Sequence, residues 1–399
     1  MKINTNSQKI EEILSRGIEK VIKQDDLEKK LKSGKQLRVK HGIDPTTSDL
    51  HLGYSVVYLK LKELQDLGHK IVFLIGDFTA RFGDPTEKLK TRKLRSKKEV
   101  KKLAKNYLKQ VASILDLKKT EVRYNSEWYD KMSAEELLQL MSNFTTSRML
   151  ERDMFQKRLK KGLDVQYHEP VYPILQGYDS VMLKSDLTVC GIDQIFNELK
   201  ARDLQVKDGQ APQDIIAVKM LVGLDGKEKM SQSLGNYIGI VEKSEQQYGK
   251  IMSIPDNLIF DYFELITRLP LDKIKRLKQD IKSKKINPRD LKARLAREVV
   301  SIYHNKEKAL LAEKEFDKIF KDKKAPSDIP EIKISGQKIN ILDLLIKTKL
   351  VSSKTEAKRL IEQKGVKINN KVQNDWQKII EIKKGMIIQI GKRRFIKIK

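Results

Sequence analysis

The sequence predicts an α/β fold in which a parallel sheet is covered by helices, followed by a helical region and a small α+β domain. Three observations support this prediction. Helical and buried-strand patterns alternate in the first part of the chain. From about residue 245 the periodicity is helical alone until past residue 330. After residue 339, one capped helix is followed by short alternating strands.

The first part of the chain contains a helix and then a buried strand. Apolar residues recur at helical spacing within residues 49–67, and Gly68 suits the left-handed position that ends a helix. The run Ile71–Ile75 is short, β-branched and apolar on both faces, as expected for a strand of a parallel sheet. A second apolar run covers residues 215–224. Parallel sheets bind ligands beyond the carboxyl ends of their strands, so we expect the functional site in the loops that follow.

The helical region is predicted to span residues 241–325. Its clearest helix follows Asn287-Pro288, where one stripe of the helix is apolar and Lys and Arg fill the other faces. The stripe consists of Leu291, Leu295, Val299 and Ile302. Residues 326–338 are predicted to form a linker, because this part of the chain is rich in charge, Pro and Ser.

The last predicted domain covers residues 339–399. Ser353 and Glu356 have the spacing of a capping box at the start of a helix, and Gly365 follows that helix. Short alternating strands then run to Gly391. This pattern predicts a compact α+β unit.

The composition is typical of an ordinary multi-domain protein. The chain has 399 residues, 39% of them hydrophobic, which is enough for two or three domains with sizeable cores. Cys190 is the one cysteine, so it has no partner for a disulfide. The N-terminal residues lack the pattern of a secretory signal, and no apolar run approaches the roughly 20 residues that span a bilayer. We therefore expect a soluble cytoplasmic protein that does not enter a membrane.

The chain is strongly basic. Its 82 Lys and Arg residues against 54 Asp and Glu give a formal net charge of +28, which attracts polyanions such as nucleic acid. Lysine is also common on solvated helix faces, so the total charge alone does not identify a nucleic-acid partner. Residues 331–399 hold 18 Lys and Arg against 6 Asp and Glu, a net +12, and this concentration favours a binding surface in the last domain.

The first motif of chemical interest runs from Gly42 to Tyr54. Ser48 or Asp49 is expected to cap the helix that follows, which places His51 in its first turn, where free N–H groups attract phosphate. His51 offers a hydrogen-bond donor to a phosphate whose charge develops during attack. An isolated His near a helix start more often caps or packs, but the motifs downstream favour binding of a ligand.

A second motif, Lys229-Met230-Ser231-Gln232-Ser233, lies 178 positions after His51 (229 minus 51). Four further stretches complete the pattern: Gly83–Thr86 with Lys88 and Arg92, Tyr172–Asp179, Gly191–Gln194 and Gly223–Gly226. Each stretch is weak alone, but their joint order is specific. The sequence resembles the bacterial tyrosyl-tRNA synthetases, of the class I aminoacyl-tRNA synthetases, over nearly its whole length.

This resemblance implies three domains. They are a Rossmann-like catalytic domain with an N-terminal helical extension (1–240), a helical anticodon-binding domain (241–325), and an RNA-binding domain like that of ribosomal small-subunit protein S-four (339–399). The implied activity is that of a tyrosine–tRNA ligase. Such an enzyme activates tyrosine with ATP, which arrives with Mg²⁺, and transfers it to the terminal adenosine of tRNA(Tyr). The resemblance also implies a homodimer, and no dedicated protein metal site is expected.

The resemblance assigns the site residues in three overlapping sets. ATP would be bound by Asp44, Thr46, His51, Gly53, Tyr54, Gly191, Asp193, Lys229, Ser231 and Gln232. Catalytic roles would fall to His51, Tyr54, Lys88, Arg92, Lys229 and Gln232. Tyrosine would be bound by Lys40, Asp84, Tyr172, Gln176, Asp179 and Gln194.

Within the tyrosine set, the resemblance implies distinct roles. Tyr172, Gln176 and Asp84 would hold the amino group, and Gln194 would contact the carboxyl group. A buried, otherwise unpaired Asp179 would accept the phenol proton and so reject phenylalanine. The spacing i, i+4, i+7 places the three residues from Tyr172 to Asp179 on one helix face.

Four positions depart from the family pattern. Tyr54 stands where the second His is usual, Gln232 replaces a Lys, Lys40 replaces a Tyr and Cys190 replaces a Gly. Gln232 removes a cation that would meet the leaving pyrophosphate, and losing one such donor costs about 3 kcal/mol. Lys40 would either donate to the phenol oxygen or point to solvent. Cys190 is interpreted as a small buried residue and not as a nucleophile.

Two alternative functions remain. The first is a synthetase-like RNA-binding protein that has lost amino-acid activation, which Tyr54, Gln232 and the basic C-terminal region would support. The second is a synthetase for another aromatic amino acid, which Asp179 disfavours. In the last domain, the basic residues expected to contact tRNA phosphates are Lys358, Arg359, Lys392, Arg393 and Arg394.

Overall fold

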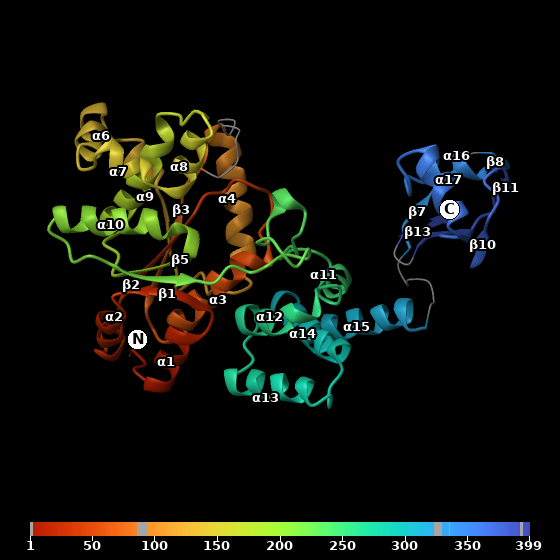
Figure 1. Cartoon of the computed structure of the whole chain (residues 1–399), viewed down its shortest axis with the longest axis horizontal. Helices are drawn as coiled ribbons and strands as arrows, with labels where there is room; N and C mark the ends of the chain where they lie inside the picture. The colour runs from red at the N-terminus through yellow and green to blue at the C-terminus, as the bar shows by residue number, and fades with distance from the viewer. Residues whose placement is uncertain (1–2, 86–94, 323–328, 335, 392–393) are drawn as a thin grey trace. The chain divides into compact units, whose positions relative to one another are not determined.

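The computed structural model of the chain describes residues 3–85, 95–322, 329–334, 336–391 and 394–399. The chain divides into two compact units, Met1–Lys306 and Glu307–Lys399 (Figure 1). The predicted boundary at residue 240 lies inside the first unit.

The first unit is built on a six-stranded sheet in the order β1-β6-β5-β2-β3-β4. The strands are β1 (Ile18–Ile22), β2 (Arg38–Ile43), β3 (Lys70–Ile75), β4 (Glu121–Tyr124), β5 (Leu187–Gly191) and β6 (Asp214–Val218). β1 pairs with β6 antiparallel and all other pairs are parallel. The strand order reverses between β2 and β5, and such a switch point is where doubly wound sheets bind their ligands. The predicted α/β fold is therefore confirmed.

Helices cover both faces of this sheet. The helices of this part of the chain are α1 (Ser7–Ser15), α2 (Gln24–Lys32), α3 (Leu52–Asp66), α4 (Lys97–Val111), α5 (Ser126–Tyr129), α6 (Ala134–Met141), α7 (Thr146–Leu150), α8 (Asp153–Lys160), α9 (His168–Leu183) and α10 (Ile195–Lys207). The side chains of two adjacent residues of β2 point to opposite faces of the sheet. Lys40 contacts α9 and α10, whereas the ring of His41 contacts Tyr58 of α3. Short 3₁₀ turns, η1 (Thr79–Arg81) and η2 (Ile192–Gln194), follow β3 and β5.

The rest of the first unit is helical, as predicted. After the short turns η3 (Gln232–Leu234) and η4 (Asp256–Leu258), its helices are α11 (Ser244–Ile251), α12 (Ile259–Ile266), α13 (Leu271–Lys282) and α14 (Pro288–Tyr303). Asn287 caps α14, and Pro288 is its first residue. Helix α12 packs against α3, and the hydroxyls of Tyr303 and Ser55 lie 2.5 Å apart. These contacts join the helical part to the helix that follows β2.

The second unit contains α15 (Lys306–Phe320) and a small α+β domain. A five-stranded sheet in the order β10-β9-β12-β13-β7 and a two-stranded sheet, β11-β8, surround two helices. The elements are β7 (Glu331–Ile332), β8 (Lys338–Asn340), α16 (Ile341–Lys347), α17 (Lys354–Glu362), β9 (Val366–Ile368), β10 (Lys371–Gln373), β11 (Ile379–Glu381), β12 (Ile387–Ile390) and β13 (Arg394–Ile398). The core includes Ile341, Leu344, Leu345, Val366 and Ile388.

Two details of this unit differ from the sequence-based expectation. Ser353 caps α17 as predicted, but the carboxylate of Glu356 accepts from Ser352. Strand β7 lies within the expected linker. It pairs with β13 in the sheet, and Lys397 lies opposite Glu331. No helix among the described residues is long and apolar enough to cross a membrane.

Candidate functional site

Residues predicted to bind ligands meet at the carboxyl ends of β2, β3 and β5. Asp44, directly after β2, accepts from Tyr172 Oη at 2.9 Å and from Thr79 Oγ1 at 2.8 Å. Gly76 follows β3, and a Cβ there would lie 2.0 Å from Asp44 Oδ1. Sequence reasoning missed both Thr79 and Gly76, because neither belongs to a recognised motif. The carboxylate of Asp44 is thus fixed at the switch point.

His51 is itself the N-cap of α3, so the prediction that Ser48 or Asp49 caps this helix was wrong. Its Nδ1 accepts from the N–H of Gly53 at 3.2 Å. Burial lowers the pKa of His51 to about 4, so the ring is neutral at physiological pH and its proton lies on Nε2. The side chain therefore offers a single fixed donor. A Cβ at Gly53 would lie 2.9 Å from the His51 ring, which explains the glycine.

The two motifs at residues 51–54 and 229–233 lie side by side. Leu52 N donates to Ile238 O, and Ile240 N donates to Leu50 O, each at 2.9 Å. Gln232 Nε2 also donates to the carbonyl of Asp49 at 2.5 Å. The amide that replaces the expected lysine therefore ties the second motif to the segment before the first.

The loop that carries Lys229 is held by hydrogen bonds between its own residues. Asp225 accepts from the backbone N–H groups of Lys227 and Glu228 and, at 2.6 Å, from Asn236 Nδ2. Asn236 Oδ1 in turn accepts from Ser231 N at 2.8 Å. These hydrogen bonds depend on side chains from both ends of the loop, Asp225 and Asn236. Sequence reasoning did not identify Asn236.

Lys229 lies beside the end of β5. Its Nζ is 3.5 Å from Asp193 Oδ2, and both side chains are about half exposed. A Cβ at Gly191 would lie 2.7 Å from Asp193 Oδ1, so the glycine leaves room for this carboxylate. The structure thus brings together two residues that were predicted to bind ATP.

Tyr54 and Thr46 lie at the edge of the same region. The ring centroid of Tyr54 is 4.5 Å from that of His51. The carbonyl of Thr46 accepts from Arg95 Nη2 at 2.8 Å, which brings a cation that the motifs did not reveal. Lys88 and Arg92, two predicted catalytic cations, lie outside the described residues.

Asp84 is paired in this structure. Arg152 Nη1 and Nη2 lie 3.1 and 3.5 Å from its two oxygens, and Gln194 Nε2 donates to it at 3.3 Å. The carboxylate predicted to hold the amino group of tyrosine therefore has a guanidinium partner. Arg152 comes from the segment before α8, and no sequence signal linked it to Asp84.

Asp179 is buried, but the expectation that it is otherwise unpaired was wrong. Trp128 Nε1 donates to Oδ1 at 3.0 Å, and Asn125 Nδ2 donates to Oδ2 at 3.4 Å. Burial raises the pKa of Asp179 to about 7, although the charge of Lys40 and the donors from Tyr129, Asn125 and Trp128 oppose that rise. The donors come from Asn125, which follows β4, and from α5, far away in sequence. The site therefore holds a carboxyl group that titrates near neutral pH.

Lys40 neither reaches solvent nor stands free for a phenol. Its side chain is 2% exposed, and Nζ donates to Ser180 Oγ at 2.6 Å and to Glu198 Oε2 at 3.0 Å. Glu198 also accepts from Gln176 Nε2 and Gln213 Nε2, each at 2.8 Å. Sequence reasoning did not single out Glu198. The substitution at position 40 is thus matched by a buried acid on α10.

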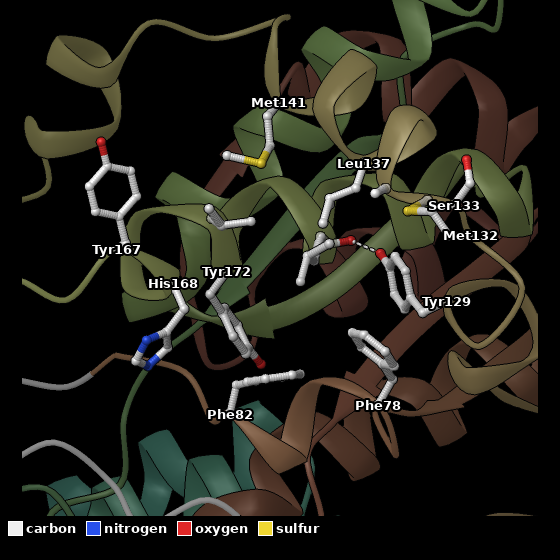
Figure 2. Close-up of a pocket in the computed structure, with 13 residues that line it drawn as sticks. Phe78, Phe82, Tyr129, Met132, Ser133, Leu137, Met141, Tyr167, His168 and Tyr172 are labelled. Carbon is white, nitrogen blue, oxygen red and sulfur yellow. Dashed lines mark hydrogen bonds between the residues drawn. The ribbon is translucent and has the colours of Figure 1, made fainter.

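Tyr172 also lines an apolar cavity of about 390 Å³ (Figure 2). Phe78, Met132, Leu137 and Val171 line the cavity together with Tyr172. Tyr167, at its edge, is 93% exposed. The hydroxyl of Tyr172 faces Asp44, so this one side chain belongs to both places.

The second unit contains the predicted RNA-binding residues. Lys358 and Arg359 are exposed on α17, and Lys358 Nζ lies 4.3 Å from the centre of the Trp376 ring. Arg394 donates to Leu350 O at 2.7 Å and pairs with Glu356 at 3.5 Å. Lys392 and Arg393 lie outside the described residues.

Known families and proteins match nearly the whole chain. The family described as tRNA synthetases class I (W and Y) matches residues 5–321, and the tyrosine–tRNA ligase SYY-like C-terminal domain matches residues 321–398. Tyrosine–tRNA ligase 2 of Clostridium acetobutylicum is 47% identical over 390 residues, with 97% of each chain covered. The tyrosine–tRNA ligase of Thermotoga maritima is 45% identical over 386 residues, with 97% of this chain and 96% of the relative covered.

Solved structures share the fold. Tyrosyl-tRNA synthetase of Archaeoglobus fulgidus, complexed with L-tyrosine, has a TM-score of 0.61 at 24% identity and covers 77% of this chain and 99% of its own. A C-terminally truncated mitochondrial tyrosyl-tRNA synthetase of Coccidioides posadasii has a TM-score of 0.63 at 23% identity, covering 77% of this chain and 91% of its own. With the joined motifs, the family match and the near-complete curated relatives, the chain belongs to the tyrosine–tRNA ligase family of class I tRNA synthetases.

Proposed function

We propose that this chain activates tyrosine with ATP and transfers the tyrosyl group to the 3′-terminal adenosine of tRNA(Tyr). The observation that carries the proposal is the backbone pairing that joins residues 50–52 to 238–240. This pairing brings two distant motifs together, which supports the proposal that they bind the phosphates of ATP as one region. The helix start at α3 adds backbone N–H groups and the positive end of its dipole.

The first step is attack of the tyrosine carboxylate oxygen on the α-phosphorus of ATP. The new bond forms between that oxygen and phosphorus, the bond to the β-phosphate oxygen breaks, and pyrophosphate leaves. In the second step a ribose hydroxyl of tRNA attacks the tyrosyl carbonyl carbon and AMP leaves. Neither step needs a protein nucleophile. Cys190 suits this mechanism because it is buried against Ile215 and Ala217, and burial raises the pKa of its thiol.

Catalysis in this proposal rests on positioning and charge. His51 Nε2 would donate to an α-phosphate oxygen as negative charge accumulates there. Lys229 would bind the β- and γ-phosphates once ATP separates it from Asp193. Gln232 would hold the loop through Asp49, so the cationic role of the usual lysine would pass to Lys229 and Arg95.

Tyrosine would bind between α9 and the end of β5. Asp179 would accept a hydrogen bond from the phenol hydroxyl in addition to those from Trp128 and Asn125. A substrate without the hydroxyl would not make this hydrogen bond, the principle by which tyrosyl enzymes are known to reject phenylalanine. Tyr172, Gln176 and Asp84 would hold the ammonium group, which requires the substrate to displace Arg152 from Asp84. Gln194 would then turn its amide N–H toward the substrate carboxylate.

Mg²⁺ would enter with ATP, bound to its phosphates, and would neutralise charge on the departing pyrophosphate. Among the described residues, no cluster of three or more His, Cys, Asp or Glu side chains is placed to hold a metal ion. We propose that the metal is part of the nucleotide substrate.

The remaining partners follow from the two units. The exposed basic residues Lys358 and Arg359 would contact tRNA phosphates, which position RNA without reading bases. We also propose a homodimer that covers the apolar cavity around Tyr167, because a side chain that is 93% exposed at an apolar edge suits a subunit interface. The setting would be the cytoplasm.

Exchange of labelled pyrophosphate into ATP tests the activity. Exchange that depends on tyrosine and not on phenylalanine supports the proposal. If no exchange occurs with tyrosine at any Mg²⁺ concentration, while the chain still binds tRNA, the RNA-binding alternative is correct. Sedimentation equilibrium of the wild type and of Tyr167→Glu measures the proposed dimer.

A further inference from the structure

We propose that Asn197 and Glu198, adjacent residues of α10, form a hydrogen-bond chain that fixes the orientation of the two amides facing the substrate, Gln176 and Gln194. The inference rests on the proposed function, in which these amides receive the ammonium and carboxylate groups of tyrosine. It assigns positioning roles to two residues that do not themselves touch the substrate.

The chain begins at an acceptor whose direction is fixed. Glu198 forms a buried ion pair with Lys40, whose ammonium can only donate. Gln213 Nε2 donates to the same carboxylate oxygen, Oε2, at 2.8 Å. An ionised carboxylate accepts at both oxygens, so its other oxygen, Oε1, requires a donor.

Gln176 supplies that donor and is thereby oriented. Its Nε2 donates to Glu198 Oε1 at 2.8 Å, which turns its Oε1 away from Glu198. Gln176 Oε1 accepts from Asn197 Nδ2 at 2.8 Å, and its second lone pair remains for another donor. An ammonium group needs this acceptor, and a flipped amide would present N–H groups to it instead.

Asn197 passes the orientation on to Gln194. Its Nδ2 donates both to Gln176 Oε1 and to Gln194 Oε1, the latter at 3.2 Å. Gln194 therefore holds its oxygen inward, and its Nε2 points to Asp84 at 3.3 Å. A substrate carboxylate needs such a donor.

The orientation of Asn197 leaves one of its buried polar atoms without a hydrogen-bond partner among the described residues. Its side chain is fully buried, and its Oδ1 has no hydrogen-bond donor among the described residues. A buried acceptor without a partner is unfavourable. A flip of Asn197 would set its oxygen against that of Gln176, so Glu198 and Gln176 together hold it in place. One chain thus gives two neighbouring amides opposite polarities toward the substrate.

Two inhibitors separate the two ends of the chain. Tyramine carries the ammonium group without the carboxylate, and 3-(4-hydroxyphenyl)propionate carries the carboxylate without the ammonium. Their inhibition constants are measured against tyrosine in pyrophosphate exchange by the full chain. Asn197→Leu releases Gln194 but leaves Gln176 tied to Glu198. We expect at least about a tenfold weaker inhibition by the propionate and a change within about twofold for tyramine.

Glu198→Gln removes the carboxylate that orients all the amides in this series of hydrogen bonds. We expect the KM for tyrosine and both inhibition constants to rise at least about tenfold, with the KM for ATP nearly unchanged. Because this variant leaves Lys40 without its counter-ion, the double variant Lys40→Met with Glu198→Gln is measured as well. Glu169→Gln is the matched control, because Glu169 forms a buried ion pair with Arg158 that does not belong to this hydrogen-bond network.

The outcomes discriminate clearly. Equal weakening of both inhibitors by Asn197→Leu would indicate a general structural effect and overturn the inference. So would an unchanged KM for tyrosine in the double variant, or a loss as large in Glu169→Gln. Absence of tyrosine-dependent exchange in the wild type would instead refute the proposed function.

Discussion

Trp128→Phe tests the view that Asp179 must be ionised to receive the phenol. The substitution removes the indole N–H that donates to Asp179 Oδ1 at 3.0 Å and keeps a smaller aromatic ring in the core. A hydrogen bond to a charged group is worth about 1.5–3 kcal/mol. One pKa unit corresponds to about 1.4 kcal/mol. The pKa of Asp179, about 7 in the wild type, should therefore rise by about 1–2 units.

The expected result is a shifted pH profile of kcat/KM for tyrosine. In the wild type, kcat/KM should rise as pH increases through about 7 and then level off. In Trp128→Phe the same rise should occur near pH 8–9, roughly one to two units higher, so activity at pH 7 falls about 5- to 50-fold, whereas at pH 9 the loss is at most about twofold. Pyrophosphate exchange between pH 5.5 and 9 measures both profiles. Trp376→Phe, in the second unit, is the matched control.

The free energy of unfolding should also depend on the titration of Asp179. Burial raises the folded pKa of Asp179 above the ordinary value of 3.8, so its contribution to stability is full below pH 3.8 and is lost as pH rises through about 7. Trp128→Phe should therefore destabilise the protein more at pH 8 than at pH 5 in urea unfolding. An unmoved midpoint in the pH profile, or an equal loss of activity at every pH, would refute the reasoning.

Three other predictions address the ATP site and the second unit. Gln232→Lys restores a cation and should speed single-turnover adenylate formation up to about 100-fold, from about 3 kcal/mol, while changing the KM for ATP less; equal rates would contradict this. Gly76→Ala should slow adenylate formation at least about 100-fold, since its Cβ would lie 2.0 Å from Asp44 Oδ1, whereas Gly249→Ala, with nothing within 4 Å, should not. Retained activity in Gly76→Ala would show that Asp44 need not be held. Deletion of residues 321–399 should abolish charging of tRNA but leave exchange within about threefold; a joint loss of both would make the second unit structural.

The sequence predicted much of the first unit because its signals are local. The run Ile71–Ile75 is one residue short of β3, and Gly68 has the expected positive φ of 99°. Asn287 and Pro288 begin α14 as predicted. Helical and strand periodicity depend on neighbours a few residues apart, so they can be recognised without knowledge of the tertiary structure.

Local reasoning failed where a competing residue was equally suitable. Ser48 and Asp49 are good caps by residue type, yet His51 caps α3 because pairing with residues 238–240 fixes the chain at that point. The expected linker contains β7 because β13, more than 60 residues later, provides its hydrogen-bonding partner. In both places backbone pairing with a distant segment decided the outcome.

The sequence by itself determined the family, the fold class and the identity of most candidate site residues. Only the tertiary structure decided what those residues contact: Asp179 has donors from Trp128 and Asn125, and Lys40 is paired with Glu198, 158 positions away. The physical reason is that such pairs arise from the crossing of strands and helices at the sheet's switch point, which leaves no periodic trace in the chain. A motif therefore indicates which groups are present, and the packing around it determines their charge and direction.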